Sequence, residues 1–302
     1  MNVKTIAVIG AGTMGRGIAY AAAFGGYATV LEDISRPRLE QAVSWIRKAF
    51  EEGVARGKVE TAVSDKALAL ISTASNVEDA IREADLIIEA VPEELEMKLE
   101  LFTIFDKFAK TGAIFASNTS SLSITDFTDV TVSRDRCVGM HFFNPVPKMK
   151  LIELVRTPHT SDETVATCQE VARRMGKEVV LVNEAPGFIT TRINALIGNE
   201  AFHMLEAGIA SARDIDKALK LGLNHPMGPF ELVDLVGLDV RLNILDYLHR
   251  TLGEKYRPNS LLRRYVQEGR LGRKTGRGVY NYPEENAAEE KAWPYEAGKN
   301  AR

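Results

Sequence analysis

The segment Thr5-Ile6-Ala7-Val8-Ile9-Gly10-Ala11-Gly12-Thr13-Met14-Gly15 is the most informative part of the sequence for the fold. It joins an apolar, β-prone run to three glycines spaced Gly-x-Gly-x-x-Gly, and an Ala-rich helical pattern follows. In a strand, turn and helix unit of this kind, Gly10 permits the tight turn, Gly12 lets a pyrophosphate approach the backbone, and Gly15 lets the helix pack closely on the strand. The helix N-terminus attracts the phosphates. The predicted cofactor-binding residues of this turn are Gly10, Gly12, Thr13, Met14 and Gly15.

Two acidic residues, Glu32 and Asp33, follow the next apolar run, residues 28–31. An acid at this point belongs beside the adenosine ribose of a bound dinucleotide. A carboxylate at Asp33 would accept hydrogen bonds from the ribose hydroxyls and repel an added 2′-phosphate, which favours NAD over NADP. Arg36 and Arg38 lie nearby in the sequence and could weaken that preference.

Further apolar runs at residues 85–89 and 113–116 alternate with helical patterns. Continuous apolar runs suit strands that are covered on both faces, so we predict an α/β fold with a Rossmann-type, doubly wound, mostly parallel sheet. Runs at 136–141 and 150–155 flank Asn144-Pro145-Val146-Pro147, and this turn permits the second run to pair antiparallel.

The pattern changes near residues 183–186, because the following segment to residue 267 shows successive helices and no convincing strand. We predict a Rossmann-like domain over residues 1–184 and a smaller all-α domain over residues 185–282. Residues 283–302 are charged, Ala-rich and weakly patterned, so we expect a mobile tail there.

Composition excludes several classes of function. The chain has 302 residues, a formal net charge of −3 and two cysteines. This balance does not suit binding to a nucleic-acid backbone or to an anionic membrane. We expect no metal site and no disulfide scaffold, and the absence of a signal peptide or a membrane-length apolar run indicates a cytoplasmic protein.

His141 is the histidine whose surroundings suggest chemistry. It ends an apolar run beside two phenylalanines, and Glu153 lies on the next predicted strand, where a returning strand could bring its carboxylate to the imidazole. Such a carboxylate fixes the tautomer and leaves the other ring nitrogen free to take a proton. The alternative is a structural His–Glu pair. The segment 118–122 follows another strand, and it could supply a substrate contact or a helix cap.

Taken together, these residues resemble the L-3-hydroxyacyl-CoA dehydrogenase family, and most closely its short bacterial branch, the 3-hydroxybutyryl-CoA dehydrogenases. The resemblance runs in family order from about residue 5 to residue 282. The matching segments are GAGTMG (10–15), EAVPE (89–93), SNTSS (117–121), GMHFFNP (139–145), PGF (186–188), NHPMGP (224–229) and KTGRG (274–278).

The resemblance implies roles for individual residues. His141 would be the catalytic base, Glu153 its partner, and Ser120 a hydrogen-bond donor to the substrate oxygen. Lys98 could instead pair with Glu94 on its own helix. The implied cofactor contacts outside the glycine turn are Asp33, Glu93, Lys98, Asn144 and Lys274.

One position departs from the family pattern. Thr191 stands where the family usually has an asparagine near the reacting carbonyl, and a hydroxyl can still donate one hydrogen bond. Arg56 is a candidate contact for the phosphates of an acyl-CoA substrate, although a solvated helix face would look the same. The resemblance also implies a homodimer formed through the helical domain.

The expected activity is therefore reversible, NAD-dependent oxidation of a short-chain L-3-hydroxyacyl-CoA to the 3-ketoacyl-CoA. Two alternatives stay open at this point. One is a dehydrogenase of a free 3-hydroxy acid such as L-gulonate, with the same His–Glu pair. The other is a non-catalytic NAD-binding relative.

Overall fold

The glycine-rich stretch folds as a strand, a turn and a helix. In the computed structural model, which describes residues 2–282, β1 (Thr5–Ile9) leads through Gly10 and Gly12 into α1 (Thr13–Phe24). The chain divides into two compact units between Phe188 and Ile189. The predicted domain limits at residues 184 and 185 lie just before this division and stay a prediction.

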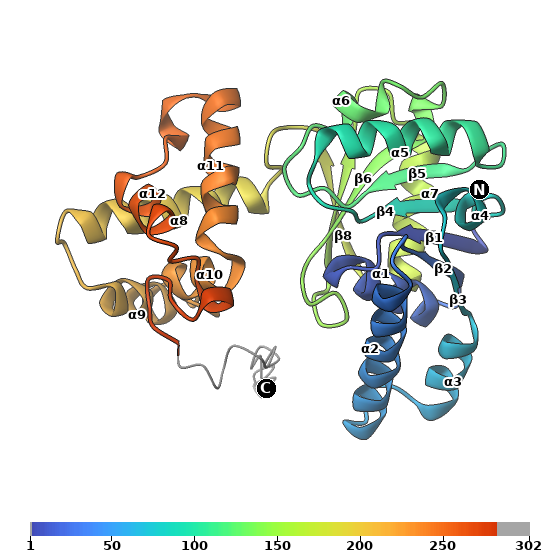
Figure 1. The fold of residues 1–302 in the computed structure, drawn as a ribbon, viewed down its shortest axis with the longest axis horizontal. Coiled ribbons are helices and arrows are strands. Elements are labelled where there is room, and N and C mark those ends of the chain that lie inside the picture. Colours follow the sequence, from blue (N-terminus) through green and yellow to red (C-terminus); the bar gives the residue numbers. More distant parts are fainter. Residues whose placement is uncertain (1, 283–302) are drawn as a thin grey trace. The chain divides into compact units, whose positions relative to one another are not determined.

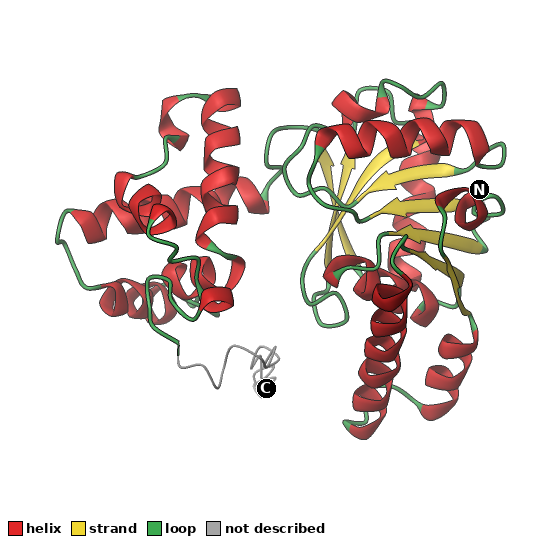
Figure 2. Cartoon of the chain, in the orientation of Figure 1, coloured by secondary structure: helices red, strands yellow, loops and turns green. Residues whose placement is uncertain are grey.

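An eight-stranded sheet forms the first unit, in the order β3-β2-β1-β4-β5-β6-β7-β8 (Figures 1 and 2). All neighbours from β3 to β6 pair in parallel, β7 runs antiparallel to β6, and β8 is parallel to β7. The mostly parallel sheet and the reversal after the proline-containing turn are both confirmed. The remaining strands are β2 (Ala28–Glu32), β3 (Ile71–Ala74), β4 (Leu86–Glu89), β5 (Ile114–Ser117), β6 (Cys137–Phe142), β7 (Leu151–Arg156) and β8 (Glu178–Asn183).

Helices cover both faces of this sheet, which explains why the strands are continuously apolar (Figure 2). Val8 of β1 enters the layer under α1, α2 (Arg36–Ala55), α3 (Thr61–Ala69) and α7 (Asp162–Arg174). Its neighbours Ala7 and Ile9 enter the opposite layer under α4 (Val77–Ile81), α5 (Leu95–Phe108) and α6 (Ile124–Thr128). Successive side chains of a strand point to opposite faces, so both faces need apolar residues.

The edge strand β3 is absent from the sequence-based prediction. Its four residues, Ile-Ser-Thr-Ala, include two exposed polar side chains, Ser72 and Thr73. An edge strand has a neighbour on one side only, and a short, polar edge also discourages pairing with another chain. The apolar run by which the other strands are recognised is therefore missing here.

The second unit is helical, as predicted. Its core includes Phe202, Phe230, Leu245 and Tyr256. Across residues 2–282, none of the helices combines the length and apolarity needed to cross a membrane. The helices of this unit are α8 (Thr190–Glu206), α9 (Ala212–Gly222), α10 (Pro229–Val236), α11 (Leu238–Leu252), α12 (Ser260–Gln267) and the short 3₁₀ turns η2 (Glu254–Tyr256) and η3 (Arg273–Thr275); a further 3₁₀ turn, η1 (Arg134–Arg136), lies in the first unit.

The end of the described chain is hydrogen-bonded to α10 through the buried carboxylate of Asp234. Asp234 accepts hydrogen bonds from the backbone N–H groups of Val279 and Tyr280, at 2.8 and 2.9 Å. A Cβ atom on Gly278 would lie 2.1 Å from Asp234 Oδ1, so the contact requires glycine. The tail predicted for residues 283–302 lies outside the described residues.

Candidate functional site

The glycine turn has the geometry that a pyrophosphate requires. A Cβ atom on Gly15 would lie 1.7 Å from the carbonyl oxygen of Gly10, so a side chain here would push α1 away from β1. Gly10 has a φ of +98°, in the region that favours glycine. Gly12 is the N-cap of α1, and a Cβ atom there would meet nothing within 4 Å. The turn is therefore open at the helix N-terminus, where phosphate oxygens bind.

The structure distinguishes the two acids that end β2. Asp33 is 5% exposed, and its Oδ2 accepts a hydrogen bond from the backbone N–H of Ala11, at 3.0 Å, inside the glycine turn. Arg38 Nη1 lies 3.4 Å from the same oxygen. Glu32 is buried as well, and burial together with the charge of Asp33 raises its pKa to about 7. Asp33 is thus the acid joined to the turn. These residues fit NAD.

Lys98 is buried in an ion-pair network at the carboxyl ends of β4 and β5. It is 1% exposed, and its Nζ lies 2.8 Å from both carboxylate oxygens of Glu89 and 3.3 Å from Glu93 Oε2. The surface pairing with Glu94 is therefore wrong, because the side chain of Lys98 turns inward toward the sheet. Burial opposes the charged form of Glu93, but Lys98 and the hydrogen bond from Thr119 outweigh it, so the pKa of Glu93 is lower than usual.

The loop after β5 wraps around Glu93. Glu93 Oε1 accepts hydrogen bonds from Thr119 Oγ1, at 2.5 Å, and from the backbone N–H of Ser120, at 3.1 Å. Ser123 rather than Ser120 caps α6, since its side chain accepts from the N–H of Asp126. Ser120 is half-buried and is not used as a cap.

The same loop is tied to the strand that carries His141. Asn118 Oδ1 accepts a hydrogen bond from the backbone N–H of Phe142, at 2.9 Å, and β5 pairs in parallel with β6. The carboxyl ends of these two strands lie at one edge of the sheet, where open α/β sheets bind ligands. Ser120 and His141 are thus presented from neighbouring strands.

His141 and Glu153 are direct partners across the antiparallel pair β6–β7. His141 Nδ1 lies 2.7 Å from Glu153 Oε2, and the two residues are 7% and 1% exposed. An ionised carboxylate can only accept, so Nδ1 carries the hydrogen and Nε2 is left to accept a proton. The rings of Phe143 and Phe188 lie 4.5 and 5.9 Å from the imidazole ring, between centroids, and make its surroundings apolar.

Arg56 and Asn144 lie outside this hydrogen-bonded group. Asn144 is exposed just after β6. Arg56 is the exposed C-cap of α2, with Nη2 3.4 Å from Glu52 Oε2. Partial burial and the positive charges of Arg56 and Lys58 outweigh the opposing charge of Glu52 and lower the pKa of Lys148, so three cations and one carboxylate lie close together here.

Thr191 and Lys274 belong to the second unit. Thr191 is half-buried in the first turn of α8. Lys274 Nζ lies 2.7 and 2.6 Å from the two carboxylate oxygens of Asp239, so its charge is met within its own unit. Within residues 2–282, no group of three or more His, Cys, Asp or Glu side chains could hold a metal ion.

Comparison with known proteins decides the family. The model of the 3-hydroxyacyl-CoA dehydrogenase NAD-binding domain matches residues 5–185, and that of the 3-hydroxyacyl-CoA dehydrogenase C-terminal domain matches residues 187–282. The chain belongs to the 3-hydroxyacyl-CoA dehydrogenase family. The expected enzyme class and the NAD cofactor are thereby confirmed.

Individual members of the family align along nearly the whole chain. The probable 3-hydroxybutyryl-CoA dehydrogenase of Bacillus subtilis is 42% identical over 288 residues, covering 95% of this chain and 100% of that protein. The human mitochondrial hydroxyacyl-coenzyme A dehydrogenase is 42% identical over 290 residues, 93% of this chain and 91% of that protein. The crystal structure of the (S)-3-hydroxybutyryl-CoA dehydrogenase from Ralstonia eutropha has a TM-score of 0.89 at 41% identity, and covers 93% of this chain and 99% of that one.

Sequence reasoning missed several residues that shape the site of this 3-hydroxyacyl-CoA dehydrogenase. Phe188 has a φ of +48° and a buried ring near His141. Ser117 and Asn118 lie in the SNTSS segment, and Glu89 begins the EAVPE segment. The motifs contain these residues, but the roles of the residues depend on hydrogen bonds between distant parts of the chain.

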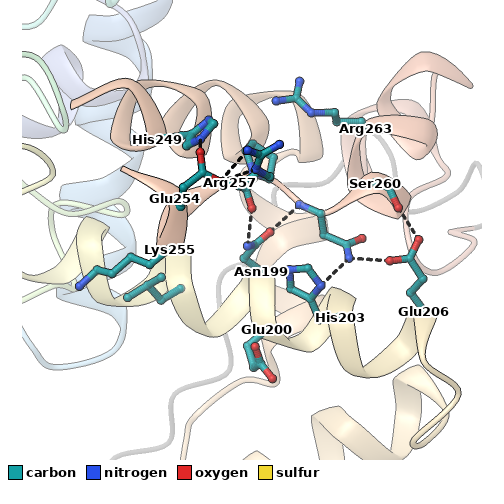
Figure 3. A pocket seen from close by; sticks show the side chains of 13 residues that line it. Asn199, Glu200, His203, Glu206, His249, Glu254, Lys255, Arg257, Ser260 and Arg263 are labelled. Atoms are coloured by element: carbon teal, nitrogen blue, oxygen red, sulfur yellow. Dashed lines mark hydrogen bonds and ion pairs between the residues drawn. The ribbon is translucent and has the colours of Figure 1, made fainter. Parts of the chain in front are cut away.

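A separate pocket of about 700 Å³ lies in the second unit of this family member (Figure 3). It contains no predicted site residue. Asn259 bonds to His203 Nδ1 at 3.0 Å and to Glu206 Oε2 at 2.8 Å, while Asn199 Oδ1 accepts from the N–H of Asn259 at 2.9 Å. These bonds fasten the start of α12 to α8, so the polar groups serve the packing of the unit.

Proposed function

We propose that this protein catalyses the reversible, NAD-dependent oxidation of short-chain L-3-hydroxyacyl-CoA, with 3-hydroxybutyryl-CoA as the type substrate. Membership of the family gives the reaction class, and the names of the aligned bacterial relatives support the short acyl chain. The observation that carries the proposal is the 2.7 Å contact of His141 with Glu153, which holds a base ready at the sheet edge.

The reaction requires that the C3 hydroxyl loses a proton while C3 loses a hydride. In our proposal, His141 Nε2 takes the hydroxyl proton, and Glu153 stabilises the imidazolium through Nδ1–H. NAD, held by the glycine turn and Asp33, would supply the acceptor for the hydride. The products are the 3-ketoacyl-CoA and NADH, and in the reverse direction the imidazolium returns its proton to the carbonyl oxygen.

The remaining site residues receive supporting roles in this proposal. Ser120 donates a hydrogen bond to the C3 oxygen, and Thr191 contributes a second hydroxyl in place of the family's asparagine. The cationic side chains of Arg56, Lys58 and Lys148 meet the phosphates of CoA. Glu93, Lys98, Asn144 and Lys274 stay proposed cofactor contacts beside Asp33 and the glycine turn.

We also propose that the protein is a homodimer formed through the helical unit. Exposed apolar side chains support this proposal, among them Ile193 of α8, Leu235 and Val236 of α10 and Val240 of α11. Light scattering should then give about twice the chain mass of 33.3 kDa. A mass near one chain would contradict the dimer. A cytoplasmic location stays part of the proposal.

The test of function is an initial-rate assay of NADH formation with L-3-hydroxybutyryl-CoA, free L-3-hydroxybutyrate and L-gulonate in parallel. The proposal predicts rapid NADH formation with the CoA thioester and little NADH formation with either free acid. A preference for a free acid would replace it with the alternative dehydrogenase. Inactivity on all three, with NADH still binding, would indicate a non-catalytic relative. Thioesters of increasing length then define the chain preference.

A further inference from the structure

Glu89 is the most completely enclosed acid at the sheet edge. It ends β4, is 0% exposed, and its carboxylate accepts hydrogen bonds from Lys98 Nζ at 2.8 Å, Ser117 Oγ at 2.5 Å and the backbone N–H of Val91 at 2.8 Å. Its backbone carbonyl accepts from the N–H of Asn118, at 2.9 Å. The side chain itself has no exposed surface through which to meet a ligand.

Two series of contacts connect the carboxylate of Glu89 to that of Glu93. Along the first, Lys98 bridges Glu89 to Glu93 Oε2 at 3.3 Å. Along the second, Ser117 Oγ accepts from the backbone N–H of Thr119 at 3.1 Å, and Thr119 Oγ1 donates to Glu93 Oε1 at 2.5 Å. Both end at Glu93, whose carboxylate holds the backbone N–H of Ser120.

Stability alone does not account for such an arrangement. Removing two charges from water costs several kcal/mol per ion, and replacing a buried ion pair by well-packed apolar residues is often neutral or stabilising. The pair of Glu89 and Lys98 lies at the end of β4 that adjoins the site. A group that only filled space there could be apolar, as Ile87 and Ile88 are in the preceding positions.

We propose that Glu89 is a positioning residue: through Lys98 and Ser117 it fixes Glu93 and the backbone of Ser120 relative to His141. The inference rests on the proposed function, in which Ser120 meets the C3 oxygen. A misplacement of about 1 Å at a reacting group can cost on the order of 10²-fold in rate. Glu89 thus affects the rate without touching substrate or cofactor.

The test uses two variants of the full-length protein. Glu89→Gln removes the charge but keeps the shape, while Ser117→Ala cuts only the second series of contacts and leaves the ion pair intact. We expect kcat to fall about 10- to 100-fold in Glu89→Gln, and by a smaller factor in Ser117→Ala, with KM for 3-hydroxybutyryl-CoA changed less than kcat. Deuterium at C3 should give a larger isotope effect on kcat than in the wild type, because hydride transfer becomes the slow step.

A matched control lies at the other end of the same strand. Asp85, just before β4, accepts from the backbone N–H groups of Lys4 and Thr5, at 2.7 and 2.9 Å, and pairs with Lys110 at 2.6 Å. Asp85→Asn therefore weakens a similar cluster away from the site. It should lower Tm but leave kcat, KM and the isotope effect unchanged. Equal losses of kcat in Asp85→Asn and Glu89→Gln, or kcat within twofold of the wild type in both Glu89→Gln and Ser117→Ala, would overturn the inference.

Titration of NADH by its fluorescence separates this inference from the function on which it rests. If the wild type does not oxidise 3-hydroxybutyryl-CoA, the proposed function fails, and the dissociation constant for NADH decides the positioning role alone. A rise of about fivefold or more in Glu89→Gln, with no rise in Asp85→Asn, supports it. The constant responds because Glu93, which Glu89 holds in place, is a proposed cofactor contact. In this case, an unchanged dissociation constant for NADH in both variants contradicts the positioning role of Glu89.

Discussion

His141 and Glu153 face each other across two antiparallel strands, and their side chains meet at 2.7 Å between Nδ1 and Oε2. The register of β6 and β7 makes the two residues direct neighbours, so the contact needs no flexible loop. Both side chains are buried, which excludes water that would otherwise weaken the interaction.

Glu153→Gln should lower kcat on the order of 10²-fold, since a neutral amide keeps the shape but no longer stabilises the imidazolium. The NADH dissociation constant should stay near that of the wild type, because Glu153 is placed against His141 and not in the glycine turn. Steady-state kinetics and fluorescence titration check both. Wild-type kcat in this variant would refute the catalytic role of the pair, and a lowered Tm beside that kcat would indicate a structural one.

Asp33→Ala should weaken NAD binding and reduce the discrimination against NADP. The change removes the carboxylate that repels a 2′-phosphate, and it also removes the hydrogen bond from the N–H of Ala11 that fixes the glycine turn. Kinetics with NAD and NADP side by side measure the effect. Unchanged KM values for both cofactors would refute the role of Asp33.

Glu93→Gln should make the stability of the protein less dependent on acid. The pKa of Glu93 in the folded protein lies below its ordinary value of 4.5, because Lys98 and the hydrogen bonds outweigh the cost of burial. Such a group stabilises the folded state above about pH 4.5, and this stabilisation is lost as the pH falls through the folded pKa. Denaturant unfolding of the wild type and of Glu93→Gln from pH 7 to pH 3 measures this. The difference between their free energies of unfolding should become smaller as the pH falls. A difference that stays the same at every pH would refute the lowered pKa of Glu93.

The two cysteines should be unreactive in the folded protein. Burial raises the pKa of Cys137 to about 11 and that of Cys168 to about 12, so neither forms much of the reactive thiolate at pH 8. A disulfide reagent that reports free thiols should react with neither in the native protein and with both after unfolding in guanidinium. Rapid reaction of the native protein would contradict the burial of one of them.

The sequence predicts the architecture well where pattern and chemistry agree. The glycine spacing and the apolar runs define β1, α1 and the parallel sheet, and the proline-containing turn predicts the reversal that brings Glu153 to His141. The strand β3 is not predicted from the sequence, because its four residues include two exposed polar side chains and show no apolar pattern.

Polar networks are harder to predict from sequence. The spacing of Glu94 and Lys98 on one helix suggests a surface pair, yet Lys98 turns inward to Glu89, nine positions away, because a buried carboxylate needs an opposite charge beside it. The role of Ser117 likewise depends on β4 and β5 lying side by side. Such partners follow from packing between distant segments, and the sequence alone does not reveal them.

His141→Gln removes the proposed catalytic base and keeps a side chain of similar polarity. With L-3-hydroxybutyryl-CoA and NAD, we predict a fall in kcat of about 10²- to 10⁴-fold, while the dissociation constant for NADH and the Tm stay close to those of the wild type. Turnover near the wild-type rate in that variant would show that His141 is not the base, because the proton of the C3 hydroxyl would then have another acceptor.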